Sequence, residues 1–89
     1  MTRKDVINAW RSGNTASIRN RYTKTLHTDG DRLYSYSVVI GYRSASKGLV
    51  AIDRTGEFFE SVTTSRHCNM AKVVATSILS PEDVNWKEV

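Results

Sequence analysis

The sequence has one cysteine, Cys68, and two histidines, and these small numbers limit the sites it can build. A single cysteine cannot form an internal disulfide, so we expect a reduced, cytosolic setting. A zinc site needs about four ligands, which usually arrive as closely spaced pairs. Here the two histidines, His27 and His67, lie 40 residues apart. The sequence therefore predicts no metal site and no cofactor.

Long apolar runs are also missing. None approaches the roughly 20 residues that a membrane helix needs. Residues 1–10 lack the apolar centre of a signal peptide, so we expect neither a membrane span nor export. With 89 residues, of which 39% are hydrophobic and 25% charged, the composition is that of a soluble globular chain. We predict one small domain over residues 1–89 with one modest core.

Residue patterns that support catalysis are scarce. The five glycines are isolated, so no glycine-rich loop can cradle a phosphate, and no G-x-S-x-G elbow surrounds a serine. His67 and Cys68 are sequence neighbours that point about 100° apart on a helix, so they cannot act together as base and nucleophile. We therefore predict that the chain is not an enzyme. A small hydrolase or transferase using His67 is the alternative, and a serine within bonding distance of His67 would favour it.

Positive charge is concentrated in the first half of the chain, and the net charge is +4. Residues 1–47 carry nine Lys or Arg against three Asp, whereas residues 48–89 carry four Lys or Arg against six Asp or Glu. This polarity favours a basic face that attracts phosphates or an acidic protein. The alternative is that the charges are simply solvated on a small surface.

The N-terminal residues carry helical signals. Thr2 and Asp5 have the spacing of a capping box, in which their side chains satisfy amides that the first turn leaves open. Gly13 supplies a C-terminal stop, so we predict a helix of about ten residues. Residues 13–22 then form a polar connection.

The middle of the chain has the composition of β-strands. The Asp-Gly pair within residues 28–31 favours a tight turn, so residues 22–42 predict a hairpin. Strands are also expected at residues 49–55 and 57–62. The second strand of the hairpin alternates large and small residues, which would place five large side chains on one face of the sheet. These are Tyr34, Tyr36, Val38, Ile40 and Tyr42.

A second helix is predicted over residues 66–79, where apolar residues recur at 3.6-residue spacing. Ser80-Pro81 ends it and caps one further turn, which would lay Val84 or Trp86 on the core. We therefore predict an α+β fold, with an antiparallel sheet of three to four strands. An N-terminal helix and a C-terminal helix packed on one face flank this sheet.

A run of hydroxyl side chains, Thr63 to Ser65, precedes this helix. Such oxygens accept hydrogen bonds from the exposed amides of a first turn, so they favour a helix cap. The same amides, together with Arg66, could instead hold a phosphate or carboxylate. We therefore predict a helix cap or anion site at Thr64, Ser65 and His67.

Basic residues interleaved with tyrosines indicate a binding surface. Exposed aromatic rings beside Lys and Arg suit single-stranded nucleic acid, and Tyr and Arg are also enriched at protein interfaces. If the tyrosines are instead core residues or cross-strand pairs, their rings would not be available. The predicted partner- or nucleic-acid-binding residues are Arg19, Arg21, Tyr22, Lys24, Tyr36, Arg43 and Arg66.

Three segments, "VINAW", "TDGDRLYSYSVVIG" and "SVTTSRHCNMAKVVA", resemble a family of small uncharacterised proteins of tailed bacteriophages. The resemblance rests on a T-D-G-x-x-L-Y-S-Y hairpin at residues 28–36, on Ile40-Gly41, and on a T-T-S-x-H helix start at residues 63–67. Cys68-Asn69 departs from the pattern. The resemblance implies a phage accessory protein in the host bacterial cytoplasm, and it implies no reaction.

Phage accessory proteins of this size commonly bind host machinery stoichiometrically, including CRISPR effectors. We therefore expect a non-enzymatic protein that binds a host protein or nucleoprotein complex and inhibits or redirects it, as an anti-CRISPR or other anti-defence protein does. Direct binding of DNA or RNA through a basic, tyrosine-containing face is the alternative. The sequence leaves self-association into a homodimer open.

Overall fold

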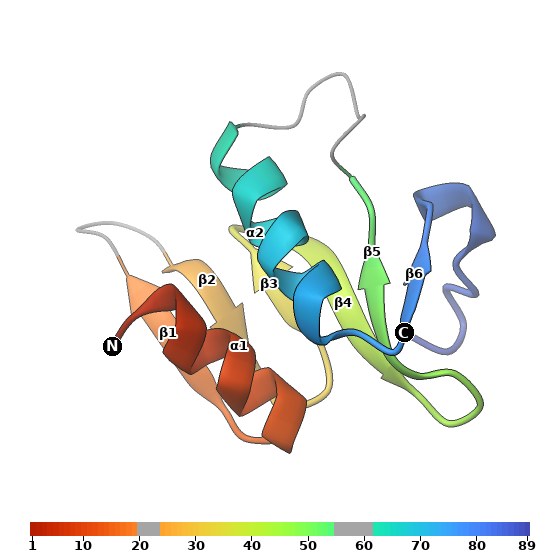
Figure 1. The fold of residues 1–89 in the computed structure, drawn as a ribbon, viewed down its shortest axis with the longest axis horizontal. Helices are drawn as coiled ribbons and strands as arrows, with labels where there is room; N and C mark the ends of the chain where they lie inside the picture. Colours follow the sequence, from red (N-terminus) through yellow and green to blue (C-terminus); the bar gives the residue numbers. More distant parts are fainter. Residues whose placement is uncertain (20–23, 55–61) are drawn as a thin grey trace.

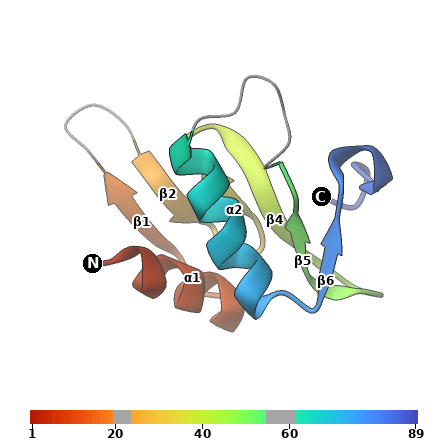
Figure 2. The same cartoon turned by 45° about the horizontal axis from the view of Figure 1, so that its top comes forward.

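The structure is a computed structural model, and it describes residues 1–19, 24–54 and 62–89. In these ranges two helices lie on one face of a single six-stranded sheet (Figures 1 and 2). The helices are α1 (Arg3–Ser12) and α2 (Val62–Val74), followed near the C-terminus by a 3-10 turn, η1 (Pro81–Asp83). The strands are β1 (Ala16–Arg19), β2 (Lys24–Thr28), β3 (Leu33–Ser35), β4 (Val38–Ser44), β5 (Gly48–Ile52) and β6 (Ser77–Leu79).

The predicted α+β fold is confirmed in outline, but the sheet has six strands instead of three to four, and it is mixed. Strands β1 to β5 follow one another as antiparallel neighbours, whereas β6 pairs with β5 in parallel. The first additional strand, β1, lies in the stretch predicted as a polar connection, where it forms an edge with no buried residue. Residues 57–61 of the predicted fourth strand lie outside the described residues.

Helix α1 has the predicted ends. The Thr2 amide donates to Asp5 Oδ2 at 2.7 Å, and the Asp5 amide donates to Thr2 Oγ1 at 3.3 Å, which is the reciprocal pairing of a capping box. The hydrogen bond from the Thr2 amide, supported by the Thr2 side chain, lowers the pKa of the Asp5 carboxyl. Gly13 ends the helix in the left-handed conformation, with φ of 79°. The helix therefore presents Val6, Ile7 and Trp10 to the sheet, where all three are buried.

The predicted second helix is displaced. Helix α2 begins at Val62 and ends at Val74, whereas the prediction ran from residue 66 to residue 79. Residues 77–79 form β6 instead, because the open edge of β5 offers them backbone hydrogen-bond partners that apolar spacing alone does not reveal. The 3-10 turn after Ser80 agrees with the predicted short turn, and Val84 is buried, whereas Trp86 is 48% exposed.

The predicted long second strand of the hairpin is two strands. Tyr36 has a φ of 56°, a turn conformation, so the chain reverses there between β3 and β4. Leu33 then pairs with Gly41, but the next residue, Tyr34, pairs with Val39. One extra residue, Ile40, therefore forms a bulge in β4.

This bulge changes which face each side chain occupies. Ile40 joins the core beneath the helices, whereas Tyr42 joins the core on the opposite face. The prediction that the tyrosines and aliphatic residues of this segment share one face is therefore wrong, because a bulge resets the alternation of side chains.

The sheet has two distinct faces. The helix-bearing face carries the larger core, with α1 over β1 and β2 and α2 over β4 and β5 (Figure 2). On the other side, which we call the far face, residues 79–89 contribute Leu79, Val84 and Val89 to a second, smaller core. That core is completed by Val39 and Tyr42 from β4 and by Val50 and Ile52 from β5. No helix among the described residues has the length and apolarity to span a bilayer.

Candidate functional site

A buried polar network joins helix α2 to strand β3. The Ser35 hydroxyl donates to Thr64 Oγ1 at 3.0 Å and lies 2.7 Å from His67 Nδ1. All three side chains are buried, with Ser35 0% and His67 1% exposed. A serine within bonding distance of His67 was the observation named as favouring a small hydrolase or transferase, and Ser35 lies at that distance, so the chemistry of this contact has to be examined.

The proton arrangement of this network limits its chemistry. A serine hydroxyl has one hydrogen, and here Ser35 gives it to Thr64. His67 Nδ1 must then carry a hydrogen and donate it to Ser35, so it cannot take the serine proton as a general base would. Burial and the nearby Arg3 charge lower the pKa of His67, which favours this neutral ring. The three residues therefore act as a hydrogen-bonded connection between helix and sheet.

The predicted helix cap is wrong in its placement. Because α2 begins at Val62, Thr64 and Ser65 lie inside its first turn instead of before it. Thr64 and His67 direct their polar atoms to Ser35 in the sheet, while Ser65 is half-buried. Residue 61, which precedes the helix, lies outside the described residues. Cys68 is a buried thiol in the helix-facing core.

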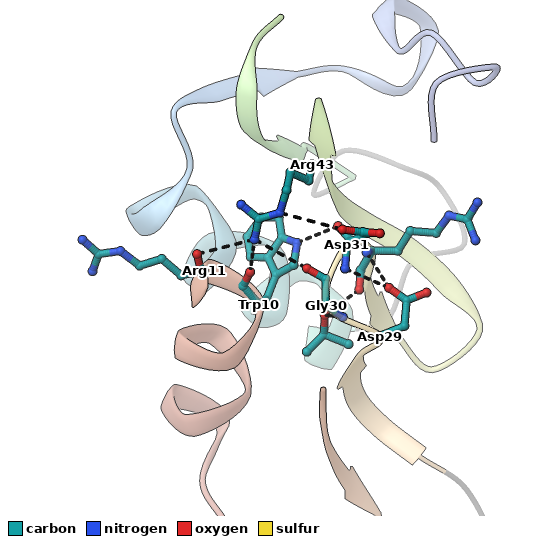
Figure 3. A network of polar contacts seen from close by, with 8 residues as sticks. Trp10, Arg11, Asp29, Gly30, Asp31 and Arg43 are labelled. Atoms are coloured by element: carbon teal, nitrogen blue, oxygen red, sulfur yellow. Dashed lines mark hydrogen bonds and ion pairs between the residues drawn. The ribbon is translucent and has the colours of Figure 1, made fainter. Parts of the chain in front are cut away.

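Arg43, a predicted contact residue, holds α1 against the β2–β3 turn (Figure 3). Its Nη2 donates to the Trp10 carbonyl oxygen at 2.6 Å and approaches the Gly30 oxygen at 3.5 Å. Its Nε lies 3.9 Å from the Asp31 carboxylate, and the Trp10 indole donates to the Asp31 carbonyl oxygen at 3.1 Å. A cation at carbonyls of a helix C-terminus is a stabilising arrangement. Arg43 therefore has a structural role, because it connects the C-terminus of α1 to the β2–β3 turn.

A cleft of about 510 Å³ lies beside Arg43 on the far face. Arg32 and Asp29 line it together with Tyr42, whose buried hydroxyl has no hydrogen-bond partner among the described residues. Burial and the neighbouring Glu88 raise the pKa of Tyr42. The lining mixes both signs of charge, and a buried hydroxyl of this kind is commonly satisfied by one water molecule. The cleft therefore indicates no particular ligand.

Among the described residues, the segment that packs on the far face covers β4 and β5, and we call the remaining region over β1, β2 and β3 the open face. Its central side chains are consecutive cross-strand partners, because Ser17 pairs with His27 and His27 pairs with Tyr34. The rings of His27 and Tyr34 are stacked, with centroids 4.8 Å apart and planes 7° from parallel. Arg19 lies two residues beyond Ser17 on the same strand, so it shares this face. The open face thus consists of Ser17, Arg19, Lys24, His27 and Tyr34.

A second irregularity brings Lys24 onto the open face. Ile18 pairs with Leu26, but Arg19 pairs with Lys24, so one residue of β2, Thr25, is bulged. Without this shift Lys24 would share the buried side of Leu26. The open face contains a cleft of about 300 Å³, and Ser17, Lys24 and His27 are among the residues that line it.

The predicted contact residues do not form one surface. Arg19 and Lys24 meet on the open face, where they are cross-strand partners. Arg66 is exposed on α2, on the other face of the sheet. Tyr36 is half-buried at the β3–β4 turn, where its amide donates to the Thr25 carbonyl oxygen at 2.9 Å, next to Lys24. Arg21 and Tyr22 lie outside the described residues.

His27 and Ser17 were not predicted as surface partners. The Asp-Gly turn was a usable signal, because a turn at residues 28–31 makes His27 and Tyr34 face each other across the hairpin. Ser17 could not be found in this way, because β1 itself was not predicted.

In the part of the chain that the structure describes, no group of three or more His, Cys, Asp or Glu side chains is placed to hold a metal ion. A scan against protein-family models, a search of curated proteins and a search of solved structures each found no match.

Proposed function

We propose that this chain is a non-enzymatic phage accessory protein that binds a host protein or nucleoprotein complex in the bacterial cytoplasm and inhibits or redirects it. The observation that supports this proposal is the unequal covering of the far face. The C-terminal residues pack on β4 and β5, while β1 to β3 keep a Tyr–His stack beside exposed Arg19 and Lys24. Aromatic and cationic side chains on a rigid sheet are typical of binding surfaces.

The alternative, a small hydrolase or transferase using His67, is disfavoured by the buried network. A nucleophile must be reached by its substrate, but Ser35 is 0% exposed. With Ser35 donating to Thr64, the His67 nitrogen that faces Ser35 acts as a donor to that hydroxyl and does not activate it. The same contact is fully accounted for as packing, since buried polar groups need hydrogen-bond partners.

Affinity purification from bacterial lysate tests the proposal. We compare the tagged chain with a Tyr34→Ala, Arg19→Ala double variant and with Arg66→Ala, which removes an exposed arginine from helix α2. We expect the wild type and Arg66→Ala to retain the same host partner, and the double variant to lose it while melting cooperatively. A double variant that keeps the partner, or no partner recovered by any form, would contradict the proposal.

A further inference from the structure

We infer that the open face binds single-stranded nucleic acid by stacking an unpaired base on the free ring face of His27, above Ser17. This inference rests on the proposed function, because it assigns the chemistry of the partner at the same surface. Five residues carry it: Ser17, Arg19, Lys24, His27 and Tyr34.

The His27–Tyr34 stack runs across the strands of the sheet. Neighbouring strands lie about 4.8 Å apart, and the two ring centroids are also 4.8 Å apart with nearly parallel planes. The rings therefore stand up from the sheet and stack along the line that joins the strands. Tyr34 covers one face of His27, so the other face of the imidazole points toward β1.

Space remains beside the face of the His27 ring that points toward β1. The partner of His27 on β1 is Ser17, whose side chain is too short to reach the height of the ring. A cleft of about 300 Å³ remains there, with Ser17 and His27 in its lining. Its size is at the lower end of the range for sites that hold small organic groups. A flat base in this cleft would continue the two-ring stack as its third member.

The His27 ring is held in place by two contacts. His27 Nε2 is hydrogen-bonded with the Tyr36 carbonyl oxygen at 2.9 Å, and Tyr34 packs on one side. A side chain that is ordered before binding loses little rotational freedom when a base stacks on it. The stack is therefore a preorganised platform.

Charge is distributed unevenly around the cleft. Lys24 lines it and Arg19 is the cross-strand partner of Lys24, so two positive charges lie at one end of the strand pair. Among the described lining residues the one acidic side chain is Asp29, which lies beyond the opposite end of β2, where its Oδ1 accepts from the Asp31 and Arg32 amides. This polarity would place a phosphate at Arg19 and Lys24 and the attached base beside His27.

A single strand fits this surface better than a duplex does. Bases in a duplex are already stacked on one another and present only their edges, whereas a single strand can turn one base onto an aromatic ring. Because stacking on a ring face needs no particular base edge, we expect weak dependence on base sequence.

Fluorescence anisotropy with labelled single-stranded DNA and RNA of mixed sequence tests the inference, at low salt and with a duplex for comparison. His27→Ala should weaken binding by about 5-fold to 150-fold, the range for loss of one base–aromatic stack. Ser17→Leu leaves the imidazole in place but fills the cleft, and it should weaken binding to a similar degree. Arg66→Ala removes one positive charge from α2 and should change the affinity less than either.

Circular dichroism and thermal melting identify the variants that fold. If His27→Ala does not fold, the binding of Ser17→Leu still decides the test. The inference is overturned if neither DNA nor RNA single strands bind at low salt, if the duplex binds more tightly, or if Ser17→Leu binds like the wild type. Equal losses for Arg66→Ala and His27→Ala would also overturn it, because they indicate general charge attraction alone. A host protein retained from nuclease-treated lysate would meanwhile leave the proposed function standing.

Discussion

The Ser35 hydroxyl lies 2.7 Å from His67 Nδ1, although 32 residues separate them in the sequence. The contact joins the hairpin at residues 28–36 to the first turns of helix α2. It fixes the first turns of α2 on strand β3 with hydrogen bonds inside an otherwise apolar contact. The packing of α2 on the sheet therefore depends on these three polar side chains.

Removal of the Ser35 hydroxyl should destabilise the fold. Ser35→Ala leaves the His67 N–H and the Thr64 oxygen without this buried partner, so we expect a loss of about 1–3 kcal/mol in the free energy of unfolding. Chemical denaturation measures it. Ser37→Ala, at an exposed serine of the same hairpin, should change stability by less than about 0.5 kcal/mol. Equal stability of the Ser35→Ala variant and the wild type would show that the network contributes nothing.

Stability should fall on mild acidification because of His67. Its pKa is lowered below the ordinary value of 6.5, so the unfolded chain binds more protons than the folded chain as the pH falls through that value. The contribution of neutral His67 to the free energy of unfolding is therefore present above pH 6.5 and decreases as the pH falls below 6.5 toward the lowered pKa of the folded state. Denaturation at about pH 7.5 and about pH 5.5, above the range of most carboxylates, measures the difference. We expect His67→Gln to show a smaller difference than the wild type, and an unchanged pH dependence would contradict this assignment.

Arg43 should resist replacement by lysine. The planar guanidinium reaches the Trp10 carbonyl and the Asp31 carboxylate together, and a lysine ammonium cannot reproduce that fork. Because the side chain is 38% exposed, we expect a moderate loss of about 1 kcal/mol, or about 4–8 °C in Tm. Arg66→Lys on exposed α2 is the matched control and should leave Tm nearly unchanged. A Tm unaffected by Arg43→Lys would remove the role of Arg43 in holding α1.

Gly41 should not tolerate a methyl group. A Cβ at this position would lie 2.6 Å from Cζ2 of Trp10 and 3.2 Å from the Val50 carbonyl oxygen. The indole is fully buried and hydrogen-bonded to Asp31, so it cannot move aside easily. Gly41→Ala should cost about 1–3 kcal/mol of stability by overpacking. Trp10→Phe opens space there, so the double variant should lose less than the sum of the single losses, and strict additivity would argue against a direct collision.

Features set by neighbouring residues were predictable from the sequence. The Thr2–Asp5 capping box, the Gly13 stop and the turn before Arg32 depend on contacts within a few residues, and all are present. The α+β class follows from the same local signals.

Features set by distant residues were not predictable. The bulge at Ile40 is visible only in the pairing with β3, and β6 depends on the free edge of β5. The network of Ser35, Thr64 and His67 likewise needs the helix and the sheet to be packed already. The open face has the same origin, because an unpredicted strand supplies Ser17 and a bulge turns Lys24 outward.

The parallel pairing of β5 with β6 has a consequence for the order of assembly. Strands β1 to β5 meet through short reversals, so each pairing closes a small loop of chain, whereas β6 returns to β5 only after the whole of α2. Longer loops cost more entropy to close before any contact is gained. The antiparallel meander should therefore form first during folding, and the docking of α2 with β6 should complete the native state and limit its rate.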